Sequence, residues 1–260
     1  MARFDGAAAL ITGAASGIGR ATAVRLASEG AALALSDVDQ EGLSETVRLC
    51  ADAHTDGRGQ AGAARPTVVS IVADVADEAA VRDLVASAVS GLGRLDVLCN
   101  VAGILAFEDF RTTTLEQWNR ILSVNLTGTF LMCREALPHL LETGGNIVNV
   151  ASTAALAGHP WTAPYSASKG GIVALTLTLA VEFGKQGVRA NAVAPGSVDT
   201  PIQEAFRLPD GADHRLLYRI MALDRSRGPE TVAGAIAFLA SEDGAHVNGE
   251  VLRVDGGTLA

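Results

Sequence analysis

One tyrosine and one lysine stand four residues apart in the segment Tyr165-Ser166-Ala167-Ser168-Lys169. The chain has only two lysines among its 20 basic residues, so arginine supplies nearly all of its other positive charge. A lysine is a compact ammonium whose pKa responds to its surroundings, whereas a guanidinium stays charged. On a helix the two side chains share a face, and a neighbouring ammonium lowers the pKa of a phenol toward the range of a general acid or base. The spacing alone also fits a half-buried tyrosine beside a surface lysine.

A glycine-rich turn near the start of the chain is the second candidate site. The first apolar run leads into a helical pattern through Thr12-Gly13-Ala14-Ala15-Ser16-Gly17-Ile18-Gly19. Such a turn directs backbone N–H groups and a helix dipole at a pyrophosphate. Gly13 makes the turn, Gly17 allows close approach and Gly19 lets the helix pack on the strand. The turn predicts a dinucleotide site that includes Ser16 and Ile18.

An acidic residue ends the second apolar run. Asp37 lies about 18 residues after Gly19, and no basic residue flanks it. A carboxylate there accepts hydrogen bonds from the adenosine ribose hydroxyls and repels a 2′-phosphate. Asp37 could instead cap the helical pattern that begins at Gln40, although Asp39 could fill that role. We therefore predict NAD as the cofactor in preference to NADP.

The elements that must position these residues alternate between short aliphatic runs and longer helical patterns. Continuous apolar strands separated by helices predict a parallel sheet covered on both faces. Right-handed crossovers then give one α/β, doubly wound, Rossmann-type domain of about seven strands over residues 1–260. Strands are expected at 8–12, 32–36, 68–73, 95–99, 146–151, 189–193 and 251–254, and helices at 17–29, 40–51, 78–92, 115–141, 163–184 and 229–241.

Two stretches break this alternation. Residues 54–66 are rich in Gly, Ala, Asp and Arg and indicate a solvated loop. Residues 201–228 are irregular, with Pro209-Asp210-Gly211 in the middle, and a long insertion of this kind is often an active-site lid.

Composition narrows the class of protein. The net charge of −9 argues against a nucleic-acid or anionic-membrane partner. The first residues contain no signal-peptide core, and the apolar stretch 172–181 is too short to span a bilayer. The three cysteines have no metal-site or redox-pair spacing, so we expect reduced thiols in a cytoplasmic protein and no metal.

Seven short motifs in a fixed order resemble the short-chain dehydrogenase/reductase family over about residues 4–257. They are the Gly13–Gly19 turn, Asp74-Val75, Asn100-Val101-Ala102-Gly103, Asn125, Ser152, Tyr165 with Lys169, and Pro195-Gly196. Each motif is short, but the ordered set is specific. Asn100 is followed by Val101 where the family usually has a second asparagine.

The resemblance implies four catalytic residues. Tyr165 would exchange a proton with the substrate oxygen, and Ser152 would hydrogen-bond that oxygen. Lys169 would lower the pKa of Tyr165 and hold the nicotinamide ribose, and Asn125 would anchor a water that links Lys169 to solvent. Hydride would pass between substrate and nicotinamide without a metal. Taken singly, Ser152 could simply end a strand and Asn125 could be a helix-surface amide.

The resemblance also extends the cofactor site beyond the glycine-rich turn. Asp74 and Val75 would face the adenine, although Asp74 and Asn100 could instead cap helices. The other implied cofactor-binding residues are Asn100, Ala102, Gly103, Tyr165, Lys169, Pro195, Gly196, Val198 and Thr200. The C-terminal Asp255-Gly256-Gly257 matches a family segment that often packs across a tetramer interface, so we expect a homo-oligomer, either tetramer or dimer.

The substrate pocket is expected between the residues after Ser152, the loop 158–161 and the lid. Trp161, Phe206, Leu208, Leu216, Leu217 and Met221 suggest an apolar lining, or they pack the lid on the body. His159 could contact substrate or be an exposed loop residue. The main hypothesis is an NAD-dependent enzyme that interconverts a small-molecule secondary alcohol and a ketone. The alternatives are an NADPH-dependent 3-oxoacyl thioester reductase, which Asp37 disfavours, and a non-catalytic NAD sensor, which the Ser152–Tyr165–Lys169 set disfavours.

Overall fold

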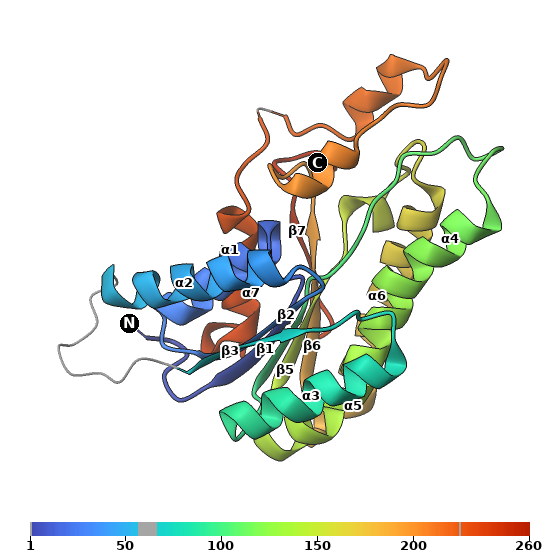
Figure 1. Ribbon diagram of the computed structural model, residues 1–260. Coiled ribbons are helices and arrows are strands. Elements are labelled where there is room, and N and C mark those ends of the chain that lie inside the picture. The colour runs from blue at the N-terminus through green and yellow to red at the C-terminus, as the bar shows by residue number, and fades with distance from the viewer. Residues whose placement is uncertain (1, 57–66, 224) are drawn as a thin grey trace.

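A single parallel sheet forms the centre of the molecule. The computed structural model describes residues 2–56, 67–223 and 225–260. Within them the strands follow the order β3-β2-β1-β4-β5-β6-β7, and helices cover both faces (Figure 1). The strands are β1 (Ala8–Thr12), β2 (Ala32–Asp37), β3 (Val68–Val72), β4 (Val97–Asn100), β5 (Asn146–Val150), β6 (Arg189–Pro195) and β7 (Val251–Val254). The order reverses between β1 and β4, and doubly wound sheets bind ligands at such a switch point.

Two aliphatic cores separate the helices from the sheet. One face is covered by α1 (Gly17–Ser28), α2 (Gln40–Asp56) and α7 (Glu230–Ala240). Leu26 of α1 and Ile236 of α7 are fully buried there. The other face carries α3 (Glu78–Leu92), α4 (Leu115–Leu122), α5 (Gly128–Thr143) and α6 (Ala163–Phe183). Leu84, Met132 and Leu140 fill that core. The predicted fold, a doubly wound sheet with helices on both faces, is confirmed.

Local capping explains where several helices begin and end. The Asp77 side chain accepts from the N–H groups of Ala79 and Ala80 at 2.8 and 3.1 Å, so α3 begins after it. Thr114 and Gln117 form a reciprocal capping box at the start of α4. α3 stops at Gly93, whose φ of 78° is open to glycine at little steric cost.

Most predicted boundaries agree with the structure within two residues, and two predictions need correction. The helix expected over 115–141 is interrupted by a π-helical segment, η1 (Ser123–Thr127), between α4 and α5. The loop expected from residue 54 begins later, because α2 continues to Asp56. The rest of that predicted loop, residues 57–66, lies outside the described residues.

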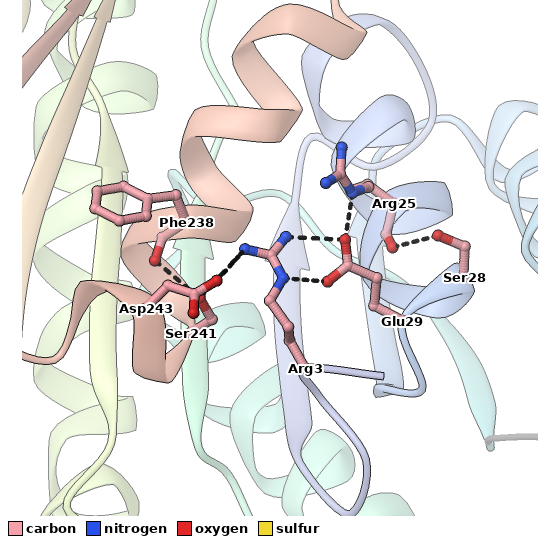
Figure 2. A network of polar contacts seen from close by, with 7 residues as sticks. All are labelled: Arg3, Arg25, Ser28, Glu29, Phe238, Ser241 and Asp243. Carbon is pink, nitrogen blue, oxygen red and sulfur yellow. Dashed lines mark hydrogen bonds and ion pairs between the residues drawn. The ribbon is translucent and has the colours of Figure 1, made fainter. Parts of the chain in front are cut away.

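A polar network holds the N-terminal segment in place at the end of the sheet where the strands begin, opposite their carboxyl ends (Figure 2). Arg3 Nη2 donates to Glu29 Oε1 at 2.9 Å and Arg3 Nη1 donates to Asp243 Oδ2 at 3.0 Å. Arg25 also contacts Glu29. Burial raises the pKa of Glu29, but hydrogen bonds from the two arginines outweigh it and hold that pKa below its ordinary value. The network links the end of α1 to the end of α7.

Helix α6 continues into a short 3₁₀ turn, η3 (Gly184–Gln186). Among the described residues, the segment Ala163–Gln186 alone is long and apolar enough to cross a membrane by length and composition. The prediction considered only residues 172–181 and therefore missed this longer segment. Here it packs against β6 and places Ile172 and Leu179 in the core. In this chain 33% of the most apolar window of the segment is buried.

Candidate active site

A cavity of about 980 Å³ opens at the carboxyl ends of the strands. Its wall is formed by the loops that follow β1 to β6 and by part of the lid segment (residues 201–228). Most of the predicted cofactor-binding residues lie on this wall, namely Gly13, Ser16, Gly17, Ile18, Gly19, Asp37, Asp74, Val75, Ala102, Gly103, Tyr165, Lys169, Pro195, Gly196, Val198 and Thr200. The fold thus brings together residues that are far apart in sequence.

The glycine-rich turn has the close backbone packing that a pyrophosphate site needs. A Cβ on Gly19 would lie 2.0 Å from the carbonyl oxygen of Gly13, so α1 can pass over the turn only with glycine there. Gly13 has φ 67°, and a Cβ on it would lie 2.8 Å from the backbone of Ala102. Helix α1 begins at Gly17 with its N-terminus on the cavity wall. This cradle fits the phosphates of a dinucleotide.

Asp37 is fixed at the end of β2 by backbone donors. Its Oδ2 accepts from Ala15 N–H at 3.0 Å and its Oδ1 accepts from Asp39 N–H at 3.1 Å. Asp39, in contrast, accepts from the N–H groups of Glu41 and Gly42 and so caps α2. The alternative in which Asp37 caps that helix is thereby excluded. The carboxylate lies on the cavity wall beside the turn, where an adenosine ribose would fit.

Tyr165 and Lys169 lie on one face of α6, as their spacing predicts. The Lys169 ammonium lies 5.6 Å from the centre of the Tyr165 ring and donates to the carbonyl oxygen of Val150 at 2.7 Å. Lys169 is only 3% exposed, and burial lowers its pKa to about 8. The lysine is therefore not a surface residue.

The pKa of Tyr165 departs from the sequence-based expectation. Burial raises this pKa, and a hydrogen bond with the Ser152 side chain acts in the opposite direction. The lowering by Lys169 that we expected from their spacing is not found, because desolvation of the phenol dominates. Tyr165 therefore holds a proton at neutral pH and is a donor in that state.

Ser152 follows β5 and lies on the same cavity wall as Tyr165. It is 7% exposed, and its Oγ accepts from Ala154 N–H at 3.1 Å at the start of the 3₁₀ turn η2 (Thr153–Ala155). That bond uses one lone pair of Oγ, and the hydroxyl also forms the hydrogen bond with the Tyr165 side chain, which places it beside the phenol. Ser152 can therefore donate to an oxygen held near Tyr165.

Asn125 lies behind the cavity wall, at the centre of η1. Its Nδ2 donates to Ile104 O at 3.0 Å and to Ser168 Oγ at 3.1 Å, and its Oδ1 accepts from Ile104 N–H at 2.8 Å. The Asn125 carbonyl oxygen accepts from Thr129 Oγ1 at 2.7 Å. Its side chain therefore holds the loop after β4 against α6. A π-helical interruption frequently marks a functional site.

Asn100, which the resemblance places at the cofactor, does not line the cavity. The side chain is 4% exposed, and its Nδ2 donates to Asn149 Oδ1 at 2.9 Å. Asn149 Nδ2 in turn donates to Thr176 Oγ1 at 2.9 Å. This buried chain connects β4 and β5 to α6, so Asn100 supports the site from below and does not cap a helix.

The part of the cavity away from the glycine-rich turn is largely apolar. Phe107 from the loop after β4 and Phe206 from the lid segment form an edge-to-face pair with ring centres 4.7 Å apart. Ile202, Leu217, Ile220 and Met221 line the wall as well, whereas Trp161, Leu208 and Leu216 do not, so the predicted lining was partly wrong. Further residues of the lining were not predicted, because no sequence motif marks them. They are Ile104, Leu105, Phe107, Arg120, Ser123 and Val124.

Comparisons with known proteins identify the family of this chain. The family described as enoyl-(acyl carrier protein) reductase matches residues 13–258. The chain is 38% identical to the 3-oxoacyl-[acyl-carrier-protein] reductase of Thermotoga maritima, over 99% of each chain. It is 37% identical to the meso-2,3-butanediol dehydrogenase of Serratia marcescens, over 99% and 96% of the two chains. A short-chain dehydrogenase from Mycobacterium paratuberculosis, solved bound to NAD, superposes with a TM-score of 0.88 at 30% identity, over 98% of each chain. The chain therefore belongs to the short-chain dehydrogenase/reductase family and is an NAD(P)-dependent oxidoreductase.

Proposed function

We propose that this enzyme interconverts a secondary alcohol and a ketone, with NAD as its coenzyme and Tyr165 as the general acid and base. The observation that carries the proposal is the convergence of Ser152, Tyr165 and Lys169 on the cavity that also holds the glycine-rich turn and Asp37. A site with a proton donor, a hydroxyl for the reacting oxygen and a dinucleotide cradle supports hydride chemistry.

The nicotinamide coenzyme, when bound, supplies or accepts the hydride. In reduction, the Tyr165 phenol donates its proton to the ketone oxygen while the carbon gains the hydride. In oxidation, Tyr165 takes the proton from the alcohol as the hydride leaves its carbon. Ser152 donates to the same oxygen and stabilises the negative charge that develops on it. Lys169, held by Val150, is positioned to bind the nicotinamide ribose and to stabilise the phenolate.

The route by which Tyr165 regains or loses its proton is also a proposal. The Lys169 ammonium lies 5.6 Å from the centre of the Tyr165 ring, and a Cβ on Gly103 would lie 3.4 Å from its Nζ and 3.3 Å from Asn125 Oδ1. The Asn125 side chain is already engaged with Ile104 and Ser168. A water in this route would therefore be bound by main-chain carbonyl groups near Asn125.

The preference for NAD rests on Asp37. The turn that contacts the ribose carries no basic side chain to receive a 2′-phosphate, since Ser16 and Val38 stand in the neighbouring positions. A carboxylate in that position repels a phosphate and accepts from both ribose hydroxyls. The NAD-bound structure of the relative from Mycobacterium paratuberculosis is consistent with this choice.

A second candidate is reduction of a 3-oxoacyl thioester with NADPH. The similarity to the Thermotoga maritima reductase and to the enoyl-(acyl carrier protein) reductase family favours it. The catalytic residues would act as above, and only the coenzyme and the substrate would differ. Asp37 argues against NADPH, so we place this candidate second.

Steady-state assays with both coenzymes and a panel of alcohols, ketones and one 3-oxoacyl thioester test the proposal. We expect turnover with NAD or NADH and a loss of at least about 10³-fold in kcat for Tyr165→Phe, with coenzyme binding unchanged. Tyr218→Phe is the matched control, because the other tyrosine of the chain is 79% exposed. A strong preference for NADPH, or an active Tyr165→Phe enzyme, would contradict the proposal.

Assembly and location complete the proposed picture. Exposed apolar side chains on α5 and α6, including Phe130 and the 82% exposed Val181, support a homo-oligomer of two or four chains. Analytical ultracentrifugation of the wild type and of Val181→Asp tests it. Cys50, Cys99 and Cys133 are buried and free, which supports a cytoplasmic location.

A further inference from the structure

The loop between η2 and α6 places a histidine on the cavity wall beside the catalytic serine. His159 Nε2 lies 3.2 Å from Oγ1 of Thr153, which directly follows Ser152 in the chain. Thr153 is 1% exposed, and both side chains line the cavity together with Ser152 and Tyr165. The interpretation of His159 as an exposed loop residue is therefore wrong.

Hydrogen bonds fix the conformation of this loop, although one of its residues is strained. Trp161 has φ 59°, the one positive value at a non-glycine residue in the described chain. A bulky residue in that region costs about 1–3 kcal/mol and persists only where its surroundings enforce it. Trp161 O accepts from Glu108 N–H at 2.7 Å, and Thr162 Oγ1 donates to His159 O at 3.1 Å. The backbone of His159 is thus held in place.

The imidazole has hydrogen-bonding capacity that the protein does not use. Burial lowers the pKa of His159, so the ring is neutral at neutral pH, with one nitrogen as donor and one as acceptor. Thr153 engages Nε2, and Nδ1 has no partner among the described residues. The part of the cavity wall that carries Phe107, Phe206 and Ile202 also includes Gln203, whose Nε2 donates to Val198 O at 2.6 Å. His159 is half-buried and its Nδ1 remains accessible, so a ligand oxygen in the cavity can pair with it.

We propose that His159, oriented by Thr153, determines specificity by hydrogen-bonding a second oxygen of the substrate, on the carbon next to the reacting one. Thr153 directly follows Ser152, and the Thr153–His159 pair lines the same cavity as Ser152, so the two groups serve neighbouring positions on a small molecule. The substrate class is then hydroxyketones, diketones and vicinal diols, and not simple ketones and alcohols. The inference rests on the proposed alcohol and ketone chemistry and deepens it.

Matched ketones that differ only in the second oxygen test this inference. The small pair is acetoin and 2-butanone, and the larger pair is 1-phenyl-1,2-propanedione and 1-phenyl-2-propanone. The measured quantity is kcat/KM for each ketone with saturating NADH, expressed as the ratio within each pair. A neighbouring oxygen also changes the reactivity of the carbonyl group, so the comparison that decides is the ratio in wild type against the ratio in each variant.

Two variants of the histidine and one control are compared. In His159→Phe, which keeps a flat ring without nitrogens, we expect the ratio of at least one pair to fall about 10- to 100-fold below that of the wild type, mainly through the substrate with two oxygens. His159→Asn keeps a donor and an acceptor and should retain part of the ratio. His246→Phe, at an exposed position outside the cavity, should leave both ratios unchanged.

The possible results separate the inference from the function on which it rests. Structural damage in His159→Phe lowers both members of a pair equally, so an unchanged ratio would overturn the inference and leave the proposed function standing. The inference would also be overturned if the wild type and every variant turned over 2-butanone at least as fast as acetoin, and 1-phenyl-2-propanone at least as fast as 1-phenyl-1,2-propanedione. No turnover of any of the four ketones with NADH or NADPH would overturn the proposed function and the inference together.

Discussion

Replacing the buried Lys169 should make the folded protein more stable and change how its stability depends on pH. In Lys169→Met an apolar chain of similar length takes the place of an ammonium that is 3% exposed. Burial lowers the pKa of Lys169 from 10.5 to about 8, so the folded state holds this proton less tightly than the unfolded state. Between these values the unfolded chain binds more protons, and the stability of the wild type rises with pH.

The magnitude follows from the two pKa values. At pH 7 the shift corresponds to about 3 kcal/mol of lost stability, and about 2.5 kcal/mol of this disappears between pH 7 and pH 10. Lys169→Met removes this penalty but leaves the Val150 carbonyl oxygen without its donor, which costs about 1–2 kcal/mol. We expect the variant to be about 1–2 kcal/mol more stable than the wild type at pH 7 and less stable than it near pH 10.

Chemical denaturation of the coenzyme-free proteins at equal concentration, at half-unit steps from pH 7 to 10, measures the difference. Because both proteins share every other titrating group, including Tyr165, the difference in their free energies of unfolding isolates Lys169. Lys185→Met, at an exposed position, is the control and should give a flat difference. Parallel curves for wild type and Lys169→Met over this range would show that burial does not depress the pKa, and would refute the reasoning.

Four further substitutions have defined outcomes. Asp37→Asn removes the charge and keeps one of the two oxygen acceptors that serve the N–H groups of Ala15 and Asp39. The ratio of kcat/KM with NADP to that with NAD should rise about 10- to 100-fold in steady-state assays, and no change would contradict the ribose role. Gly19→Ala places a Cβ 2.0 Å from Gly13 O and should abolish coenzyme binding measured by fluorescence, whereas Gly170→Ala in α6 meets nothing within 4 Å and should raise the free energy of unfolding by up to about 1 kcal/mol. Lys169→Arg should lose most of kcat, because a guanidinium cannot replace a compact ammonium; near-normal kcat would show that shape is unimportant.

Much of this site could be predicted because its elements have strong local signals. The buried strands are continuous aliphatic runs, and the spacing of Tyr165 and Lys169 places them on one helix face whatever surrounds that helix. Asp39 competes with Asp37 as a helix cap in the sequence, and only coordinates show which carboxylate takes which role.

The features that could not be predicted depend on tertiary contacts. The pattern from 115 to 141 is helical throughout, and its π-helical interruption accompanies the bonds from Asn125 to Ile104 and Ser168, which come from other elements. The pKa of Tyr165 follows the depth of the cavity and not the spacing to Lys169. His159 stands in a Gly-His-Pro-Trp stretch, which the sequence alone predicts to be an exposed turn. The hydrogen bond from Glu108 N–H to the Trp161 carbonyl holds this loop in place and is not visible in the sequence.

Two unfavourable energies, backbone strain and the desolvation of a charge, occur in one short part of the chain, from the loop before α6 to the second turn of that helix. Trp161 is strained, and Lys169 is a desolvated ammonium. Both persist because bonds from outside α6 hold them, Glu108 N–H on Trp161 and the Val150 carbonyl on Lys169. A fold selected for stability alone would place glycine at the strained position and an apolar residue at the desolvated one. We therefore expect substitutions that relieve strain or desolvation here to stabilise the protein and impair turnover together, whereas equal changes in the Arg3–Glu29 network should affect stability alone.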